Sequence, residues 1–295
     1  MKKATLIINP SSGGEKAKKY EKLTKEKLES FFDIVDIKYT EKAGDATVFA
    51  KNAAKEKHHS VFVMGGDGTV NEGISGIAEL DYRPNFGFFP LGTVNDLARA
   101  LKIPLNPEQA IKNFNPDNIS DLDIGKINNS YFMNVVAIGT IPESINNVDS
   151  KEKTRLGKVA YFVSGAKELM NTGFYDFELS IDNSNQQIKT STILIGLTNS
   201  IGGFETMFPK AKVNDGKLHL AYIKDTSLLD TVLALPELLH GIDKSSTHIE
   251  YFTSSNISVK LINSTDKLSV NVDGDEGDSL PVSIKILPSH LKVYK

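Results

Sequence analysis

The first part of the chain alternates short apolar runs with longer segments in which apolar residues recur at helical spacing. Apolar runs bounded by turn residues predict buried strands, and the helical spacing predicts helices that cover them. We expect strands at Ala4–Ile8, Ile34–Tyr39, Val61–Met64 and Asn85–Phe89, and helices at Glu15–Phe32, Asp45–Lys57, Thr69–Ile77 and Val94–Leu101. This order predicts a parallel sheet with helices on both faces.

The pattern changes at about residue 120, where period-two and β-branched runs are separated by Gly, Asn, Asp and Ser. Many short strands with turns between them predict a mostly antiparallel sandwich or barrel-like domain. We expect strands at Ile119–Ile127, Tyr131–Ile138, Tyr175–Ile181, Ile188–Thr198, Leu218–Ile223, Ile257–Ile262, Leu268–Val272, Val282–Leu287 and Leu291–Tyr294, and helices at Lys158–Met170 and Leu228–Leu239. The prediction is an α/β domain over residues 1–120, to which residues 289–295 return, and a β-rich domain over residues 121–288.

Composition narrows the possible classes of protein. Of the 295 residues, 40% are hydrophobic and 24% are charged, which is ordinary for a globular chain. The net charge of -3 gives no support for nucleic-acid binding, and the absence of cysteine excludes disulfides, thiolate zinc sites and cysteine nucleophiles. No apolar stretch approaches the ~18 residues of a membrane span, and Met1–Thr5 does not resemble a signal peptide. We therefore expect a cytoplasmic protein without a transmembrane segment.

A glycine-rich turn follows the apolar run Ser60–Met64 and precedes a predicted helix. It reads Gly65-Gly66-Asp67-Gly68-Thr69-Val70-Asn71-Glu72. Glycines let the backbone approach an anion closely, and the amide groups at a helix N-terminus attract phosphate. Asp67 cannot attract phosphate itself, so we expect it to hold a cation, a water or a hydroxyl, which indicates chemistry as well as binding.

Two further loops have the same position between a strand and a helix. They are Asn9-Pro10-Ser11-Ser12-Gly13-Gly14 and Pro90-Leu91-Gly92-Thr93-Val94-Asn95-Asp96. Each could be an ordinary turn, with Ser12 near one helix cap and Thr93 capping the other. Loops at the carboxyl ends of parallel strands commonly form the site of such a sheet, so three of them together favour function.

Several catalytic patterns are absent from the sequence. It has no P-loop motif, no protein-kinase motif set, no His-Glu-x-x-His, and no complete Gly-x-Gly-x-x-Gly. The six histidines show no metal-ligand spacing, and we expect His58-His59 to form a solvated helix end.

The motifs together resemble the diacylglycerol kinase catalytic family, in particular its soluble bacterial lipid kinases. The resemblance begins with Gly65–Glu72, Gly92-Thr93, Asn95-Asp96 and Arg99. It continues through Tyr131–Asn134, Gly139, Asn199, Gly202-Gly203, Pro209, Ala211, Asp215-Gly216, Leu218 and Asp273–Glu276. NAD kinases and phosphofructokinases share the Gly-Gly-Asp-Gly turn but are not expected to carry the Gly92–Asp96 loop.

The resemblance implies an ATP-binding set and a divalent ion. The ATP-binding set is Asn9, Pro10, Ser11, Ser12, Gly13, Thr40, Gly65, Gly66, Asp67, Gly68, Thr69, Val70, Asn71, Glu72, Thr93, Asn95 and Asp96. A structural ion would bind the Asp215 carboxylate and the carbonyls of Lys212 and Lys217, and oxygen ligands of this kind suit magnesium. From the residues alone, Asp215-Gly216 is an ordinary hairpin turn.

The acidic segment 273–278 supplies the other catalytic candidates. The family motif is Asp-Gly-Glu with the glutamate as the base, whereas this chain reads Asp273-Gly274-Asp275-Glu276. Either Asp275 replaces the glutamate or Glu276 has slipped by one residue, and the register favours Asp275 beside Asp273. Together with Asp67, these three acids are the predicted catalytic residues. The alternative is a solvated acidic hairpin.

Two helices bear on the acceptor. The predicted first helix carries lysines, at positions 16, 18, 19, 22, 25 and 27, that could meet anionic lipid headgroups, although its glutamates favour a solvated mixed-charge face. The leucine-rich segment 228–239 fits core packing or, alternatively, a lipid-facing groove.

The resemblance therefore implies a kinase in which the two domains close on a cleft and ATP with magnesium phosphorylates a lipid hydroxyl. Diacylglycerol, presented at a membrane surface, is the first acceptor to expect, and peripheral binding to the inner membrane surface and a homodimer are compatible with the sequence. Two alternatives stay open: a kinase for a soluble acceptor such as NAD, and a catalytically silent regulator that binds nucleotide or lipid.

Overall fold

The computed structural model describes residues 1–15, 17–139, 173–224, 230, 233–234, 237–238, 241–262 and 267–295. The chain divides into two compact units, Met1–Ile124 with Pro288–Lys295, and Gly125–Leu287. The expected helix Lys158–Met170 lies outside the described residues. Within Leu228–Leu239, only Asp230, Leu233–Ala234 and Glu237–Leu238 are described, and they are helical. None of the described helices is long and apolar enough to span a bilayer.

The first unit contains the predicted parallel sheet. Its strands are β1 (Lys3–Ile8), β2 (Ile34–Tyr39), β3 (Ser60–Gly65) and β4 (Asn85–Pro90), in the order β2-β1-β3-β4. The end of β16 (Val282–Tyr294) joins the sheet in parallel beside β4, where Val293 pairs with Phe86. Since Ile8 pairs with Met64 and Met64 with Phe89, the carboxyl ends of the central strands lie level with one another.

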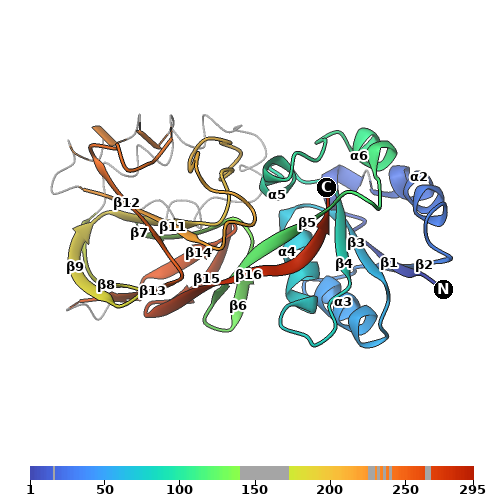
Figure 1. Cartoon of the computed structure of the whole chain (residues 1–295), viewed down its shortest axis with the longest axis horizontal. Coiled ribbons are helices and arrows are strands. Elements are labelled where there is room, and N and C mark those ends of the chain that lie inside the picture. Colours follow the sequence, from blue (N-terminus) through green and yellow to red (C-terminus); the bar gives the residue numbers. More distant parts are fainter. Residues whose placement is uncertain are drawn as a thin grey trace. The chain divides into compact units, whose positions relative to one another are not determined.

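Helices cover both faces of this sheet. They are α1 (Ser12–Glu15), α2 (Ala17–Glu29), α3 (Asp45–Lys55), α4 (Asp67–Ile77), α5 (Asp96–Ala100) and α6 (Pro107–Asn113). Helices α3 and α4 pack together on one face, and α2 and α6 lie on the other (Figure 1). The expected helix Glu15–Phe32 is shorter than predicted and is preceded by a kink, because Gly13 and Gly14 adopt left-handed φ values of 63° and 69°. Helix α6 was not expected, although Asn106 caps it and Pro107 opens it, which are typical start signals.

An aromatic cluster forms much of the core of the first unit. The Phe62 ring is fully buried, stacks on Tyr294 at 5.3 Å between centroids, and meets Phe32 and Phe114 edge to face. The Tyr294 hydroxyl lies 2.7 Å from Ser60 Oγ. The last strand is therefore attached to the sheet by ring packing and by a buried hydrogen bond as well as by backbone pairing.

Replacing Tyr294 with phenylalanine should lower the free energy of unfolding by about 1 kcal/mol, because the ring packing remains and only the buried hydroxyl is lost. Urea denaturation would measure the change. Tyr39→Phe is the matched control, since the Tyr39 hydroxyl also makes one hydrogen bond, to Glu21, but at an exposed position. An equal change in the two variants would contradict a structural role for the buried hydroxyl.

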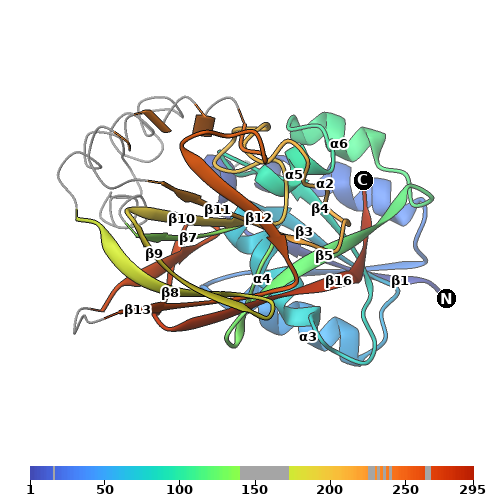
Figure 2. The ribbon, with the colours of Figure 1, turned by 60° about the vertical axis from the view of Figure 1, so that its left-hand side comes forward.

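The second unit is a sandwich of antiparallel sheets (Figure 2). One sheet contains β16, β13 (Asn256–Leu261), β8 (Tyr175–Ile181) and β9 (Ser184–Thr190) in that order, and β5 (Ile119–Ile127) pairs with β16 and with β6 (Ser130–Phe132). The other sheet runs in the order β12 (Ile249–Ser254), β11 (Leu218–Ile223), β10 (Thr192–Gly196), β7 (Val135–Gly139), β14 (Ser269–Val272) and β15 (Asp275–Ser279). The predicted α/β and β-sandwich architecture is thus confirmed.

Some strand boundaries differ from the prediction. The run Ile188–Thr198 breaks at Ser191, which lets β9 and β10 enter different sheets, and Tyr131–Ile138 breaks into β6 and β7. Conversely, β16 is one continuous strand through Pro288, where two strands were expected. Strand β12 was not expected. Period-two patterns locate strands but do not say where a chain changes sheet, because that depends on contacts distant in sequence.

Alternate side chains of the second sheet serve two hydrophobic clusters. On β7, Val136 and Ile138 face the core between the sheets, whereas Val135 and Ala137 pack on the other face with Met207 and Phe208. Both faces of this sheet are therefore covered, which explains why β7 and β10 are buried along their whole length.

Candidate active site

The structure brings the three predicted loops together at the carboxyl ends of β1, β3 and β4. The Asn9 backbone N–H donates to the Met64 carbonyl at 3.0 Å, and the Leu91 N–H donates to the Gly65 carbonyl at 2.8 Å. The Asn9 side chain donates to Thr69 Oγ1 at 3.0 Å, which links the first loop to the start of α4. Each loop thus contacts the next through the hydrogen-bonding pattern of a parallel sheet.

Glycine is required at two further places where the loops approach one another closely. A Cβ at Gly92 would lie 2.7 Å from Asn95 Oδ1 and 3.0 Å from the Gly66 Cα, so neither loop can carry a side chain where they meet. Gly13 has a φ of 63°, and a Cβ there would lie 2.9 Å from the Leu91 carbonyl oxygen. The glycines of the sequence motifs therefore allow backbone to approach backbone within this unit.

Asp67 joins the second loop to the third. Its carboxylate accepts hydrogen bonds from the backbone N–H groups of Asn95, at 2.8 Å, and Asp96, at 3.0 Å. Burial raises the pKa of Asp67, the Asn95 hydrogen bond opposes that rise, and the charge of Asp96 adds to it. In its described contacts, Asp67 is a residue that positions the third loop.

Asn95 fixes the internal shape of the third loop. Its backbone is left-handed, with φ 56°, and its side chain bonds both the N–H and the carbonyl of Gly92, at 2.9 and 2.8 Å. Helix α5 begins only at Asp96, so the expectation that Thr93 caps it is wrong. Asp67 from the neighbouring loop instead accepts the N–H groups of the N-cap residue Asn95 and of the first helical residue, Asp96. Thr93 is exposed at the loop tip.

The remaining predicted nucleotide residues fall into two groups. Ser11 donates to Asn9 Oδ1 through its hydroxyl at 2.8 Å, and the Thr40 N–H donates to the Ile8 carbonyl directly before Asn9, so both lie at the first loop. Pro10 lies in the same loop, Ser12 opens α1 directly after it, and Gly68 is exposed in the first turn of α4. By contrast, Val70 is buried, Asn71 accepts a hydrogen bond from Ser75, and the Glu72 carboxylate accepts from the Ala46 N–H at the start of α3.

In the second unit, Asp273 and Gly274 form the turn of the β14–β15 hairpin, with φ values of 51° and 97°. The Asp273 carboxylate accepts hydrogen bonds from the N–H groups of Met133, Asn134 and Val135 at 2.7 to 2.9 Å. Asp273 therefore secures the loop between β6 and β7 to the hairpin, a role that the sequence did not indicate.

The two other acidic candidates point to opposite faces of β15. Asp275 is paired with Val272 and Glu276 with Asn271, so the pleat separates their side chains, and both are exposed. Only one of them can face a given bound group. Which of the two could act as the base therefore depends on which face of the sheet meets that group. Further along the strand, Asp278 accepts a hydrogen bond from Asn128 at 2.9 Å.

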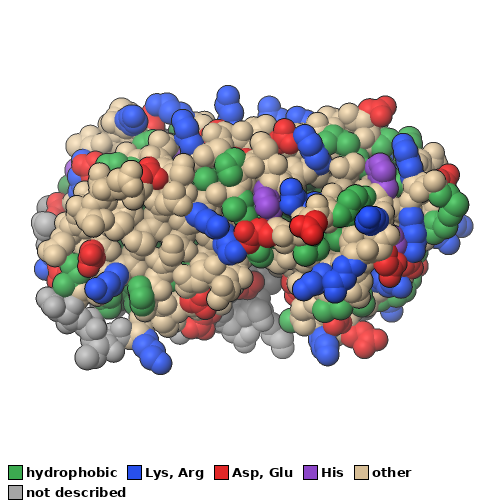
Figure 3. Space-filling model, turned by 60° about the horizontal axis from the view of Figure 1, so that its bottom comes forward, with side chains coloured by type: hydrophobic (Ala, Val, Ile, Leu, Met, Phe, Trp, Pro, Cys, Tyr) green, Lys and Arg blue, Asp and Glu red, His purple; other side chains and the backbone are tan. Residues whose placement is uncertain are grey.

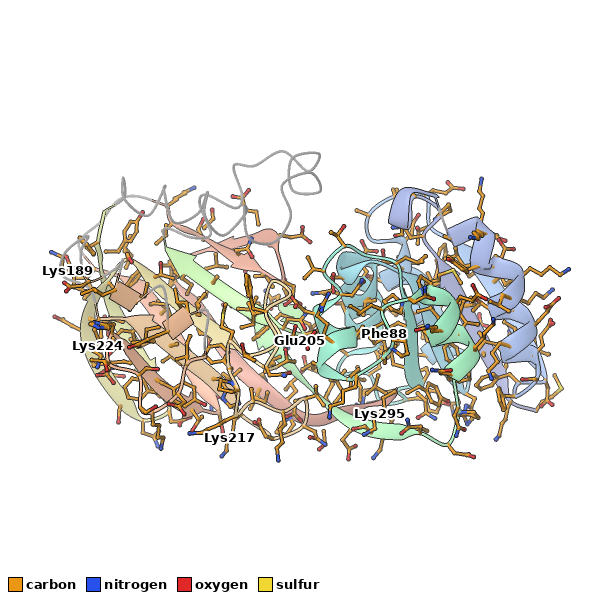
Figure 4. All side chains as sticks on the ribbon, turned by 90° about the horizontal axis from the view of Figure 1, so that it is seen from above. Phe88, Lys189, Glu205, Lys217, Lys224 and Lys295 are labelled. Carbon is orange, nitrogen blue, oxygen red and sulfur yellow. The ribbon has the colours of Figure 1, made fainter. Side chains whose placement is uncertain are left out.

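The predicted ion-binding loop is organised around Asp215. Its carboxylate accepts from the N–H groups of Lys212 and Lys217, both at 3.1 Å, and from His219 Nε2 at 3.0 Å. Burial acts to raise the pKa of Asp215, but the His219 hydrogen bond and charge and the two backbone bonds outweigh it, so the pKa is lowered. Lys217 directly precedes β11 and Lys224 directly follows it, at the two ends of the strand (Figure 4).

His219 and Tyr251 extend this network and were missed in the sequence. His219 follows Leu218 and precedes Leu220 in the chain, but its side chain lies on the opposite face of β11 and is buried there. Its Nδ1 lies 2.6 Å from the Tyr251 hydroxyl. Burial, followed by the charges of Asp215 and Asp243, raises the pKa of Tyr251 to about 12. The polar residue within an apolar strand was the available signal.

The predicted ligand set of this loop contains a single side-chain carboxylate, which is too few for a site made of protein ligands alone. Among the described residues, no three His, Cys, Asp or Glu side chains gather as a metal site. Magnesium retains several waters and often takes only one or two protein carboxylates. Asp215 is the one carboxylate of the predicted ligand set. The groups of Lys212 and Lys217 that contact it are their backbone N–H groups, and the Lys212 carbonyl accepts a hydrogen bond from the Asp215 N–H at 3.3 Å.

The charged surface is mixed. On α2, Lys22 pairs with Glu26 at 3.9 Å and Lys25 with Glu29 at 3.6 Å. The face of the molecule drawn in Figure 3 likewise shows cationic and anionic side chains interspersed. Such pairs lower the net positive field of a helix, so α2 is not by itself a strong anchor for anionic lipid.

Two protein-family models match the chain, and together they cover most of it. The diacylglycerol kinase catalytic domain matches residues 3–127, and the YegS C-terminal NAD kinase beta sandwich-like domain matches residues 134–295. A Streptococcus pneumoniae protein provisionally named as a lipid kinase is 40% identical, with 100% of this chain and 98% of that protein covered. The diacylglycerol kinase of Bacillus subtilis is 35% identical, with 99% and 96% covered. A solved Bacillus anthracis structure, provisionally described as a diacylglycerol kinase, has a TM-score of 0.87 and 28% identity, and the match covers 100% of this chain and 95% of that one.

Proposed function

The chain belongs to the diacylglycerol kinase catalytic family, and from that premise we propose that it transfers the terminal phosphoryl group of ATP to the free hydroxyl of diacylglycerol. Family membership makes it an ATP-dependent lipid kinase, and diacylglycerol as acceptor is the proposal. The observation that carries it is the pair of Asp67 hydrogen bonds, which holds the Gly92–Asp96 loop against the Gly65–Gly68 turn.

The converging loops are suited to bind a triphosphate. Glycine at the close contacts removes side chains that would keep phosphate oxygens from the amide groups, and the N-terminus of α4 adds its dipole. Three residues at the first loop are proposed to contact the nucleotide next to its phosphates: Asn9, Ser11 and Thr40. Phosphoryl transfer depends mainly on positioning and on charge stabilisation, so a rigid loop cluster is the feature that such chemistry needs.

The acceptor hydroxyl must lose a proton as its oxygen bonds to the terminal phosphorus and ADP leaves. We assign the proton to the Asp275 carboxylate, because it occupies the position of the base in the family motif and is exposed on β15. Asp273 is assigned a positioning role, since three backbone N–H groups already occupy its oxygens.

Magnesium ions are proposed at two places. One accompanies the phosphates of ATP, where it would neutralise the charge that develops in transfer. The other binds the Lys212–Lys217 loop through Asp215 and stabilises the fold of that loop.

If the second ion binds as proposed, magnesium should raise the melting temperature in the absence of nucleotide. At ten times the dissociation constant, the gain is about 1.4 kcal/mol, or a shift of about 3 °C. Differential scanning fluorimetry with magnesium and with EDTA would measure it. In Asp215→Asn, the shift should disappear. Asp243 is an acid outside this loop and pairs with Lys210, so the shift should remain in Asp243→Asn. An identical shift in all three proteins would contradict a site at Asp215.

Incubation of the full chain with labelled ATP, magnesium and mixed micelles tests the function. The micelles would contain dioleoylglycerol, monooleoylglycerol and sphingosine, with NAD in solution, and labelled products would be separated by chromatography. Labelled phosphatidic acid is expected. If a different lipid is labelled, the assigned acceptor is wrong but the assignment as a lipid kinase stands. Labelled NADP would overturn that assignment. ATP binding without any labelled product would favour a catalytically silent regulator.

A further inference from the structure

A cavity of about 440 Å³ lies in the first unit, at the edge of the sheet where the strands begin. Lys2 directly precedes β1, His59 directly precedes β3, and Asn85 opens β4, and all three line the cavity. The candidate nucleotide loops follow the opposite ends of these strands. Six-residue strands span about 20 Å, so the cavity is separate from those loops.

Part of the cavity lining is apolar. Phe31 and Ile119 line the cavity and each keeps 38% of its surface exposed, whereas Phe32 and Tyr294, which also line it, are buried. Single exposed apolar residues are ordinary, but here two of them share one hollow with two buried rings. The volume lies within the range of about 300–1,000 Å³ that is typical of small-molecule sites.

Polar side chains that can donate hydrogen bonds also line the cavity. The His59 Nδ1 lies 2.8 Å from Ser60 Oγ, and among the residues that the structure describes, His59 Nε2 has no partner. Lys2 is exposed, and the described residues supply no ion pair for its ammonium group. Asn85 contributes a side-chain amide, whose Nδ2 also lies 3.4 Å from the Tyr294 hydroxyl. Asp117 also lines the cavity and is exposed, and the Asp33 carboxylate accepts a hydrogen bond from the Lys2 backbone N–H at 2.6 Å. Among the described residues, these two acids oppose a bound anion.

We propose that this cavity binds a small carboxylate with an apolar body, the carboxylate facing Lys2, His59 and Asn85 and the body lying against Phe31 and Ile119. Burial, and after it the charge of Lys2, lowers the pKa of His59, so both effects disfavour the charged ring when the site is free. A carboxylate between Lys2 and His59 would offset both effects and favour the charged ring. The site needs neither ATP nor the acceptor lipid, so it is independent of the proposed kinase activity.

Isothermal titration of the full chain tests the class of ligand. The probes are decanoate, for a lipid-derived acid, and 3-phenylpropionate, for an aromatic acid, each compared with the corresponding alcohol. At least one acid should bind saturably at one site per chain, and at least tenfold more tightly than its alcohol. Binding of decanoate alone would indicate a lipid source, and binding of 3-phenylpropionate alone an aromatic one. Saturable binding of neither acid, or equal binding of acid and alcohol, would overturn the proposal.

Variants at exposed positions locate the site without threatening the fold. Lys2→Ala should weaken binding at least tenfold, and Ile119→Trp, which fills the cavity, should abolish it. Asp117→Asn should bind at least as tightly as the wild type, and Lys51→Ala, an exposed lysine of α3, should bind equally. In NMR titrations, the ligand should raise the pKa of His59. Unchanged affinity in both Lys2→Ala and Ile119→Trp would place any binding elsewhere and overturn the proposal.

Discussion

Replacing Asp67 with asparagine should lower kcat/KM by about 10²- to 10⁴-fold while the protein remains folded. The carboxylate accepts one backbone N–H on each oxygen, from Asn95 and Asp96. Asparagine keeps the shape but turns one acceptor into an NH₂ donor that faces another donor. Hydrogen bonds to a charged group contribute about 1.5–3 kcal/mol each, and that energy here sets the position of the third loop.

Asp45→Asn is the matched control for this experiment. The Asp45 carboxylate also accepts two backbone N–H groups, from Glu41 at 2.8 Å and Lys42 at 3.0 Å, both on Oδ2, but it is partly exposed and lies outside the three loops. Its variant should keep activity within about twofold. The amide resonances of Asn95 and Asp96 should shift in Asp67→Asn only. Wild-type kcat/KM in Asp67→Asn would remove Asp67 from the mechanism.

The same interaction predicts a dependence on pH. Because burial raises the pKa of Asp67, its carboxylate gains a proton at a higher pH than an unperturbed aspartate does. Protonation removes one acceptor, so activity should fall on acidification, and it should do so at a higher pH than a solvated aspartate would cause. In Asp67→Asn, the decline of the residual activity should move to a lower pH, since asparagine does not titrate.

The convergence of the loops could be predicted from the sequence because parallel topology dictates it. Once four apolar runs alternate with helices, their carboxyl ends share one edge, and Asn9, Gly65 and Leu91 must lie near one another. The partners of Asp67 could not be predicted in this way. They lie 28 and 29 residues further along the chain, and the left-handed backbone of Asn95, which no helical periodicity reveals, determines where α5 begins.

The Asp-Gly pairs show the same division between local and distant information. Asp273-Gly274 and Asp215-Gly216 are alike as dipeptides, yet only the first forms a two-residue hairpin turn, between the paired residues Val272 and Asp275. The second lies in a loop whose shape depends on His219 and two backbone N–H groups. Flanking strand pairs decide between these outcomes, and the sequence does not show which strands pair.

If Asp275 is the base, Asp275→Asn should lower kcat by about 10²- to 10⁴-fold and leave the KM for ATP nearly unchanged, because general-base catalysis contributes about that much. Glu276→Gln should stay within about threefold of the wild type. The two side chains leave opposite faces of β15, so only one of them can reach the acceptor oxygen. Both are exposed, so neither variant should lower the free energy of unfolding appreciably.

Two further variants separate the chemistry from the local charge. Asp278→Asn removes an acid from the same strand that already bonds Asn128, and it should keep activity. Asp275→Glu restores the Asp-Gly-Glu order of the family motif and should retain the activity that Asp275→Asn loses. If Glu276→Gln loses activity and Asp275→Asn does not, the base has moved one residue along the strand. The opposite face of the sheet would then be the one that meets the acceptor.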